Sequence, residues 1–374
     1  MSNATLLFSV HPLLSYESFQ TKKDDRLRRY WSSIEQRRGL LKAVRRKDTV
    51  PLHNLSSLAD PSKHHFLHVN DLTSSQLSKL LQIALEMKQE LKQMGRYRTK
   101  PLDGKTLAMI FAKPSARTRI SFETGMYLLG GHALYLGEEV GIGKREAVKD
   151  VARVVSSMND TIMARLYAHS DLLELARFSK VPVINGLTDY NHPCQIIADA
   201  LTILEEKKKL QGVKVVYIGD GNNIVHSWLE LTSLVELELI CCCPEGFEPN
   251  QTLLDLVNRS GRGKASVEYD PWKAVVGADV IYTDVWASMG QKSSLQQRMQ
   301  IFSPYQVTMD LMKASQNKDT LFMHCLPAER GRECDDKVIE SPNSKVFQQA
   351  ENRMHAQNTI LLYCHGMLNH QLVG

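Results

Sequence analysis

The feature that most constrains the fold is a repeated alternation of short β-rich runs with longer helical patterns, which begins near residue 65. The first series of expected strands lies at residues 106–112, 132–137, 161–166 and 181–186. A second series lies at residues 214–222, 237–243, 266–270, 279–286 and 320–327. Between them, apolar residues recur at helical spacing, as in the segment 146–160. Such alternation predicts parallel sheets with helices on both faces.

The expected fold class is α/β, with two doubly wound domains, each with a mostly parallel sheet, and an active site in the cleft between them. A chain of 374 residues is long enough for two cores. The helix that ends near Leu210 separates the two series of strands and marks the boundary. We expect an N-terminal extension, two domains, and a last helix that returns to the first domain, at residues 1–64, 65–210, 211–345 and 346–374.

The net charge of +5 is unevenly placed along the chain. Residues 1–64 contain 12 Lys or Arg and 6 Asp or Glu, so the rest of the chain carries a net charge of about −1. A nucleic-acid-binding protein needs a basic face on its folded body, whereas this excess lies in a leader. No run approaches the roughly 18 uninterrupted apolar residues of a membrane span. We therefore expect neither a nucleic-acid partner nor a membrane.

The leader has paired arginines, several serines and a single acidic residue among its first 23 positions. It lacks a compact apolar core followed by a small-residue cleavage site, so the pattern favours an organellar transit peptide over a secretory signal. Asp24, Asp25 and Glu35 weaken this pattern. An N-terminal extension without a targeting role is the alternative.

The cysteines predict neither a disulfide framework nor a zinc site. There are seven of them, an odd number, and no CxxC pair occurs. The run Cys241–Cys243 ends an expected buried strand. We expect reduced and mostly buried thiols, with Cys325 as the exception, and no bound metal.

The segment KPSARTR, at residues 113–119, lies between an expected strand and an expected helix. The first backbone N–H groups of a helix have no intrahelical acceptor, and they attract anions. Ser115 and Thr118 add hydroxyl donors, and Arg117 adds a forked cation that suits two phosphate oxygens. The turn therefore predicts a site for a small, multiply charged anion. An ordinary helix cap with solvated arginines is the plainer alternative.

Other polar residues stand at strand ends or helix starts in the first series. Arg165 ends one expected strand and is either a surface residue or directed at the ligand. In the segment HPCQ, Pro193 belongs to a first helical turn, which leaves His192 and Gln195 about one turn apart. A histidine can donate to a carbonyl oxygen, and the Gln amide can bond a carbamoyl group. A helix cap without a ligand is the alternative.

The second series offers three similar segments. GDGNN, at 219–223, lacks the third glycine of a dinucleotide fingerprint, which argues against a nicotinamide oxidoreductase. Asp284 ends an expected strand, where it either pairs with a cationic substrate nitrogen or caps the strand. Cys325 also ends a strand, and Pro327 follows closely, which predicts a thiol that faces the ligand rather than the more usual core.

Taken together, these segments resemble the ornithine carbamoyltransferase family, particularly its plant-type members. The resemblance is carried by KPSARTRISFETG, MARLYAHSD, VINGLTDYNHPCQIIADALT, GDGNNIVHSW, DVWASMGQ, FMHCLPAERG and AENRMHAQN, which lie between about residues 65 and 367. It implies transfer of a carbamoyl group from carbamoyl phosphate to the δ-amine of L-ornithine, which yields citrulline in arginine biosynthesis. It also implies a homotrimer without metal or organic cofactor, and favours the chloroplast over the mitochondrial matrix.

The resemblance also implies residue roles, with carbamoyl phosphate bound by residues 65–210 and ornithine by residues 211–345. By similarity, the phosphate-binding residues are Ser115, Ala116, Arg117, Thr118 and Arg165. The carbonyl oxygen would be surrounded by Thr118, Arg165, His192 and Arg353. The carbamoyl NH2 would be held by Gln195 and by the backbone carbonyls of Cys325 and Leu326. The ornithine-binding residues would be Asn223, Asp284, Ser288 and Met289, with Cys325 as the proton acceptor.

Two positions depart from the family. Ala116 stands where relatives often carry Met or Thr, a change that leaves the backbone donors in place. Gly141 stands where the family often has a Gln that reaches the phosphate site of a neighbouring subunit, so that contact is not carried over.

The alternatives to ornithine are other acceptors of the carbamoyl group. Aspartate-specific relatives have an HPLPR-like segment where this chain has HCLPA, and acetylornithine-specific relatives tend to have Lys at the place of His324. Putrescine as the acceptor, or a catalytically silent relative that binds anions, are the remaining alternatives.

Overall fold

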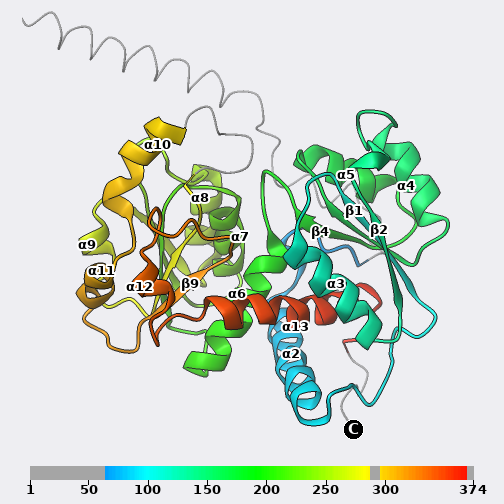
Figure 1. The fold of residues 1–374 in the computed structure, drawn as a ribbon, viewed down its shortest axis with the longest axis horizontal. Helices are drawn as coiled ribbons and strands as arrows, with labels where there is room; N and C mark the ends of the chain where they lie inside the picture. Colours follow the sequence, from blue (N-terminus) through cyan, green and yellow to red (C-terminus); the bar gives the residue numbers. More distant parts are fainter. Residues whose placement is uncertain (1–63, 287–294, 369–374) are drawn as a thin grey trace, which may run out of the picture. The chain divides into compact units, whose positions relative to one another are not determined.

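The computed structural model describes residues 64–286 and 295–368. Two parallel sheets of four and five strands, with helices around them, make up this part of the chain (Figure 1). The expected α/β class is therefore confirmed. The N-terminal leader and two of the expected ornithine ligands, Ser288 and Met289, lie outside the described residues.

The first sheet has the order β2-β1-β3-β4, and all its strand pairs are parallel. Its strands are β1 (Thr106–Phe111), β2 (His132–Leu136), β3 (Thr161–Arg165) and β4 (Val183–Leu187). All four were expected from the sequence, with ends that differ by one or two residues. The inner strands β1 and β3 are almost fully buried, as continuous apolar runs in a parallel sheet predict. The edge strand β2 is largely exposed.

Helices cover both faces of this sheet. They are α2 (Ser74–Met94), α3 (Ala116–Leu128), α4 (Val148–Ser156), α5 (His169–Phe178) and α6 (Pro193–Lys207), with short 3-10 turns η4 (Val69–Asp71) and η5 (Glu138–Val140). The helix α4 has apolar residues on one face, and these pack with α5 and the sheet in one core cluster.

The last helix, α13 (Val346–Cys364), packs against α2, α3 and α6. Its Asn358 lies so close to Gly125 of α3 that a Cβ at position 125 would stand 2.0 Å from the amide oxygen. A glycine is therefore required at this contact. The helix begins beside β9 of the second sheet and runs along the helices of the first (Figure 1).

The second sheet has the order β7-β6-β5-β8-β9 and is also fully parallel. Its strands are β5 (Lys214–Ile218), β6 (Glu238–Cys242), β7 (Lys264–Glu268), β8 (Val280–Thr283) and β9 (Leu321–His324). The surrounding helices are α7 (Asn223–Thr232), α8 (Gln251–Ser260), α9 (Pro271–Ala274), α10 (Leu295–Phe302), α11 (Met309–Ala314) and α12 (Asp336–Ile339), with the turn η7 (Ser303–Tyr305).

One core cluster joins α9, α11 and α12 to this sheet, while α7 lies against the other face with Trp228 edge-on to Tyr282. All seven cysteines are free; six are buried, and Cys325 is half-buried. The expectation of reduced, mostly buried thiols is confirmed.

The strand orders place the carboxyl ends of certain strands at switch points, where open α/β sheets bind ligands. In the first sheet β2 lies on one side of β1 and β3 lies on the other, so the order of the strands reverses between β1 and β3. In the second sheet the same change of direction lies between β5 and β8. KPSARTR follows β1, and GDGNN follows β5. The sequence segments with unusual polar content therefore lie where the topology favours a ligand.

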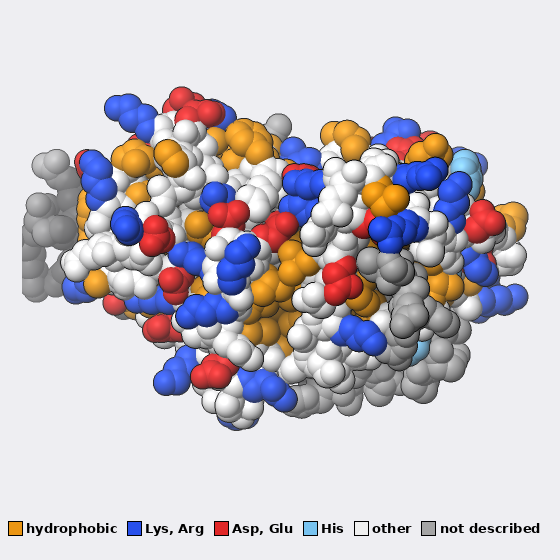
Figure 2. Space-filling model, turned by 90° about the horizontal axis from the view of Figure 1, so that it is seen from below, with side chains coloured by type: hydrophobic (Ala, Val, Ile, Leu, Met, Phe, Trp, Pro, Cys, Tyr) orange, Lys and Arg blue, Asp and Glu red, His pale blue; other side chains and the backbone are white. Residues whose placement is uncertain are grey.

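Away from these strand ends, a groove is lined by α2, the end of α6 and the links after α7 and α8. Apolar side chains also form a hollow between charged ones on the face shown in Figure 2. Within the described ranges, none of the helices has the length and apolar character needed to cross a bilayer.

The core of the second sheet provides a test of the fold. Phe322 on β9 is fully buried, whereas Phe347 on α13 is 61% exposed. We expect Phe322→Ala to lower the free energy of unfolding by about 3–5 kcal/mol, because it leaves a cavity among rigid neighbours. Phe347→Ala, the matched control, should have a small effect. Urea denaturation monitored by circular dichroism measures both, and equal shifts would contradict this packing.

Candidate active site

The turn after β1 is both a helix cap and an array of outward donors. Ser115 is the N-cap of α3: its hydroxyl oxygen accepts a hydrogen bond from the Thr118 backbone N–H at 3.4 Å. The Ser115 hydroxyl also donates to the Thr118 hydroxyl oxygen at 3.1 Å. Capping satisfies one helical N–H group and leaves the others of the first turn for a ligand. The two interpretations of KPSARTR are therefore compatible.

Buried arginines gather beside this turn. Arg165 at the end of β3 is 7% exposed, and Arg353 of α13 is 3% exposed. Burial, followed by the charges of Arg353 and Arg117, lowers the pKa of Arg165 to about 10. The pKa of Arg353 is also lowered, mainly by burial. Like charges held together away from water are stabilised by an anion, so these residues favour a phosphate-sized ligand.

Lys113, which was not among the expected site residues, adds a fourth cation. Its side chain is buried, and its ammonium group lies 4.2 Å from the ring centroid of Tyr167. Burial and then the charge of Arg165 lower the pKa of Lys113. Lys113 stands two residues before Ser115 in the same segment, so the sequence alone could have indicated it as a further anion-binding residue.

Gln195 is fixed by partners on both sides of its amide. Its oxygen accepts a hydrogen bond from Arg353 Nη1 at 2.7 Å, and its nitrogen donates to Asp199 Oδ1 at 2.8 Å. The other terminal nitrogen of Arg353, Nη2, donates to the Thr118 hydroxyl at 3.2 Å. Arg353 therefore links the turn after β1 to the start of α6.

Asp199 is a supporting residue that the sequence reasoning missed. It is fully buried, and burial raises its pKa to about 7. It also accepts a hydrogen bond from Gln349 Nε2 at 2.7 Å, and the Gln349 oxygen accepts from the His324 backbone N–H at 2.9 Å. This chain of contacts connects α6 with the end of β9. Its one local signal was the spacing of four residues between Gln195 and Asp199.

His192 is held by its backbone and keeps a free ring nitrogen. Its N–H donates to the Ser227 hydroxyl oxygen of α7 at 2.8 Å. Among the described residues, Nδ1 of His192 has no hydrogen-bond partner. Burial, followed by the charges of Arg353 and Arg165, lowers the pKa of His192 well below its ordinary value. The ring is therefore neutral at physiological pH and can donate one hydrogen bond to a substrate oxygen.

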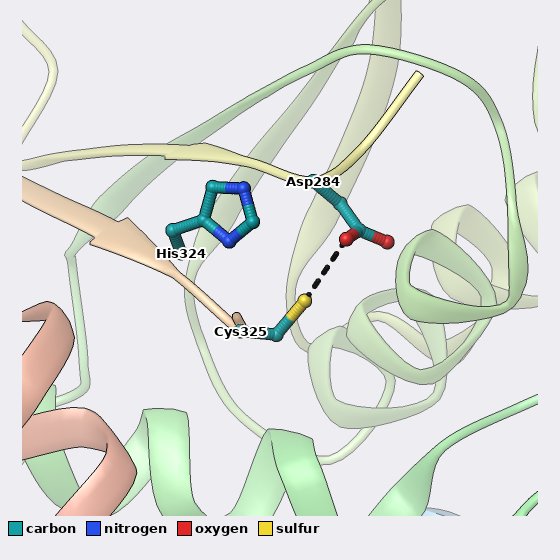
Figure 3. Close-up of side chains that lie close together, drawn as sticks. All are labelled: Asp284, His324 and Cys325. Carbon is teal, nitrogen blue, oxygen red and sulfur yellow. Dashed lines mark hydrogen bonds between the residues drawn. The ribbon is translucent and has the colours of Figure 1, made fainter. Parts of the chain in front are cut away.

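Asp284 and Cys325 face each other from the ends of two neighbouring strands (Figure 3). The Cys325 thiol donates to Asp284 Oδ1 at 3.1 Å. Asn222, the N-cap of α7 and another residue that was missed, donates from Nδ2 to Asp284 Oδ2 at 2.9 Å. The neighbouring Asn223 donates to the Thr188 carbonyl at 2.7 Å. Of the two asparagines in GDGNN, the first is the one that contacts Asp284.

The thiol of Cys325 is protonated in this arrangement. Burial, and then the charge of Asp284, raise its pKa well above the ordinary value. The sequence reasoning required surroundings that favour the thiolate. In the absence of substrate, the surroundings favour the thiol.

The backbone of Leu326 is held in an unusual conformation. Its φ angle of 57° lies in the left-handed region, which is costly for a side chain with a Cβ. The Leu326 N–H donates to His324 Nδ1 at 2.9 Å, and His324 Nε2 lies 3.0 Å from Glu333 Oε1. Both supporting side chains are fully buried. This rigid support suits a backbone carbonyl that must point at a ligand.

Residues of the types that commonly bind metal ions also lie close together here. Potential ligand atoms of Asp284, His324 and Cys325 lie within 4.8 Å of one another, as do those of His324, Glu333 and Cys334. Both ring nitrogens of His324 already contact protein atoms. The expectation of no metal stays an expectation.

The glycine at position 141 has a conformational reason. It ends the turn η5 with φ of 62°, and an added Cβ would stand 2.7 Å from Cβ of Arg145. A Gln at this place would be strained and crowded.

The structure thus brings together most of the expected residues. Arg117, Arg165 and Arg353 form one group of charges, to which Thr118, His192 and Gln195 are adjacent. A charge on Cys325 would act on both Arg165 and Arg353, which places the second group beside the first. Ser288 and Met289 lie outside the described residues.

Comparison with known proteins gives two family matches. The "Aspartate/ornithine carbamoyltransferase, carbamoyl-P binding domain" matches residues 64–205. The "Aspartate/ornithine carbamoyltransferase, Asp/Orn binding domain" matches residues 211–364. These families cover the first and second sheets respectively.

Individual relatives agree. A chloroplastic ornithine carbamoyltransferase of Pisum sativum is 55% identical over 302 residues, which are 80% of each chain. The solved ornithine carbamoyltransferase of Pyrococcus furiosus has a TM-score of 0.75 and 48% identity, and the match covers 80% of this chain and 96% of that one. A mitochondrial ornithine carbamoyltransferase of Coccidioides immitis has a TM-score of 0.75 and 35% identity, covering 82% and 99%. The chain belongs to the aspartate/ornithine carbamoyltransferase family.

Proposed function

We propose that this chain is an ornithine carbamoyltransferase, which transfers the carbamoyl group of carbamoyl phosphate to the δ-amine of L-ornithine and releases phosphate. The observation that carries the proposal is the meeting of buried arginines with the Asp284–Cys325 pair. The first group suits a doubly charged phosphate and the second suits a cationic amine. The names of the relatives support the choice of substrates.

The residue roles follow the hydrogen-bonding capacity of each group. The first turn of α3, with Arg117 and Arg165, would hold the phosphate. His192 and Arg353 would donate to the carbonyl oxygen. Attack by the amine places negative charge on this oxygen, and each prearranged donor there typically contributes ~3–4 kcal/mol to the transition state.

The carbamoyl NH2 group needs acceptors. The Gln195 oxygen already accepts from Arg353 and retains a second lone pair for this purpose. The backbone carbonyls of Cys325 and Leu326 would provide the others. The fixed backbone of Leu326 keeps its carbonyl in place without reorganisation during the reaction.

The amine must lose a proton before it attacks. Its pKa should resemble that of lysine, about 10.4, so the neutral form near pH 7.4 costs about 4 kcal/mol. Asp284 would bind the ammonium form, and this positive charge would in turn stabilise a thiolate on Cys325. We therefore assign Cys325 as proton acceptor only in the presence of ornithine, since the thiol alone is neutral.

Assembly and location also belong to the proposal. Exposed apolar side chains stand on α3 and the edge strand β2, namely Ile120, Tyr127, Leu134 and Tyr135. Exposed apolar side chains are typical of protein interfaces and support self-association, and the homotrimer is the assembly that the family resemblance implies. The Pisum sativum relative is chloroplastic, which together with the basic leader supports a plastid location. We also retain the division into domains at residues 65–210 and 211–345, with the final segment on the first domain.

The choice of acceptor tests the proposal directly. A coupled assay with ornithine, putrescine and aspartate should give citrulline fastest, because the relatives are named ornithine carbamoyltransferases and HCLPA lacks the arginine of aspartate-specific relatives. Carbamoylputrescine formed at the same rate as citrulline would overturn the choice of ornithine. Carbamoyl phosphate binding in calorimetry without turnover would instead favour a silent relative.

The phosphate site gives a second prediction. Arg117→Ala should lower kcat/KM by about 100- to 1,000-fold with an unchanged fold, because one prearranged cation is lost. Arg153→Ala is the matched control, since Arg153 is exposed on α4 and pairs with Asp150 at 3.2 Å. Steady-state kinetics with circular dichroism measure both, and an Arg117 variant as active as the control would exclude the phosphate role.

The proton acceptor gives a third prediction. Because the pKa of Cys325 is raised, its thiol ionises only when the pH is well above the ordinary pKa of a cysteine. Cys325→Ser, whose hydroxyl does not ionise in this range, should lower kcat and shift the alkaline part of the pH–rate profile. A profile of unchanged shape would remove Cys325 from proton transfer.

A further inference from the structure

One face of α7 is hydrogen-bonded along its length to the loop that carries His192. The four residues concerned have the spacing of a single helical face: Asn223, His226, Ser227 and Glu230. Each of them has a partner in the loop between β4 and α6, namely the Thr188 carbonyl, the Tyr190 carbonyl, the His192 N–H and the Asn191 side chain. The helix that begins at the proposed ornithine site therefore also fixes the position of His192.

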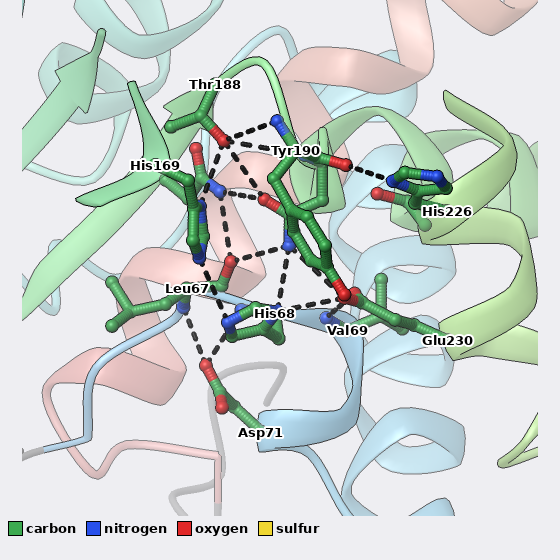
Figure 4. A network of polar contacts seen from close by, with 12 residues as sticks. Leu67, His68, Val69, Asp71, His169, Thr188, Tyr190, His226 and Glu230 are labelled. Carbon is green, nitrogen blue, oxygen red and sulfur yellow. Dashed lines mark hydrogen bonds and ion pairs between the residues drawn. The ribbon is translucent and has the colours of Figure 1, made fainter. Parts of the chain in front are cut away.

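Glu230, at the far end of this face, is buried and has several partners. Its Oε2 accepts from the Val69 N–H at 2.9 Å, and its Oε1 lies 2.8 Å from His68 Nδ1. The same Oε1 accepts from Asn191 Nδ2 at 3.3 Å. Figure 4 shows Glu230 and His68 directed at each other beneath Tyr190.

Both ring nitrogens of His68 face groups that can accept a proton. On one side is the Glu230 carboxylate, and on the other is His169, whose Nε2 lies 3.3 Å from His68 Nε2. His169 Nδ1 lies 3.0 Å from the Thr188 hydroxyl oxygen, to which it can donate. Asn191 Nδ2, a donor, also lies 2.9 Å from His68 Nδ1. When His68 is an imidazolium that donates to Glu230 and to a neutral His169, Asn191 donates to the Leu67 carbonyl and to Glu230 Oε1 instead of to this ring nitrogen.

We propose that Glu230 and His68 form a charged pair that holds the His192 loop against α7, and that both are positioning residues for carbamoyl transfer. Neither residue touches the proposed substrates. They act through Asn191, which precedes His192, and through Val69 and Thr188. This inference rests on the proposed function.

The surrounding charges agree with this assignment. Burial alone would lower the pKa of His68, but the Glu230 carboxylate and then Asp71 raise it above 6.5. Burial, and then His68, lower the pKa of His169 to about 3, so this ring is a neutral acceptor. Of the other titratable groups nearby, Asp71 accepts from the His68 N–H at 2.9 Å, the Tyr190 ring packs edge-on to His68, and burial lowers the pKa of the half-buried His226.

The sign of the pH dependence follows from the raised pKa. The ion pair is fully present below the ordinary histidine value of 6.5 and is lost as the pH rises through the raised value. If the Glu230–His68 pair positions His192, mutation of either member of the pair should lower kcat most at low pH. At high pH the wild-type enzyme has also lost the charge, so the difference should shrink.

Two conservative variants test the pair. Glu230→Gln removes the charge and keeps one acceptor oxygen, so it also loses the hydrogen bond to either Val69 or Asn191, which donate to different oxygens of Glu230. His68→Asn keeps a donor towards Glu230 and removes the histidine's charge. At about pH 6.5, either variant should lower kcat for citrulline formation roughly 10- to 150-fold, with little change in the KM for carbamoyl phosphate. As the pH rises through the raised pKa of His68, the ratio of wild-type to variant kcat should fall towards one.

A control on a more exposed pair shows whether the loss of any histidine's carboxylate partner has the same effect. Glu351→Gln removes the carboxylate of another histidine pair on α13, with 3.7 Å between His355 Nε2 and Glu351 Oε1, and should leave kcat unchanged at low and high pH. A ratio for His68→Asn that is near one at low pH, or equally large at low and high pH, overturns the inference, and so does a ratio near one at low pH for Glu230→Gln. If Glu230→Gln does not fold, His68→Asn decides alone. Failure of the proposed function would appear in the wild-type enzyme, which would then form no citrulline.

Discussion

Repulsion among buried arginines is the constraint around which the rest of the site is arranged. Arg165 and Arg353 have lowered pKa values, first because they are removed from water and then because other arginine charges lie near: Arg353 and Arg117 act on Arg165, and Arg117 acts on Arg353. An isolated protein tolerates this cost only where other interactions hold the groups in place. Here Gln195 and Thr118 hold Arg353, and Asp199 holds Gln195. A doubly charged phosphate would relieve this repulsion. Its binding would therefore be favoured beside the carbamoyl group that reacts.

The two sheets are joined at this site by polar contacts that serve both substrates. Asp199 reaches Gln349 and through it the end of β9, which leads into Cys325. On the other side, α7 reaches from Asp284, through its cap Asn222, to the loop before His192. Both connections run between the proposed carbamoyl phosphate site and the proposed ornithine site. A movement of the residues at either proposed substrate site would therefore be transmitted to the other site.

Much of the fold could be predicted because it rests on local patterns. Each expected strand was found, since buried parallel strands are short apolar runs, and the ends differed by one to four residues, most where the polar site segments follow β5, β8 and β9. Site residues at strand ends, such as Arg165 and Asp284, could be named for the same reason. Glu230 and His68 could not, because they are 162 residues apart and their pairing is set by tertiary packing. The raised pKa of Cys325 also depends on burial that sequence does not display.

The last helix has a consequence for how the enzyme is made. Arg353 and Gln349 lie on α13, which follows all nine described strands along the chain. During synthesis both sheets can form while these two side chains are still within the ribosome. The nascent protein would therefore lack the guanidinium that joins α3 to α6, and the proposed site would be completed only after α13 has left the ribosome.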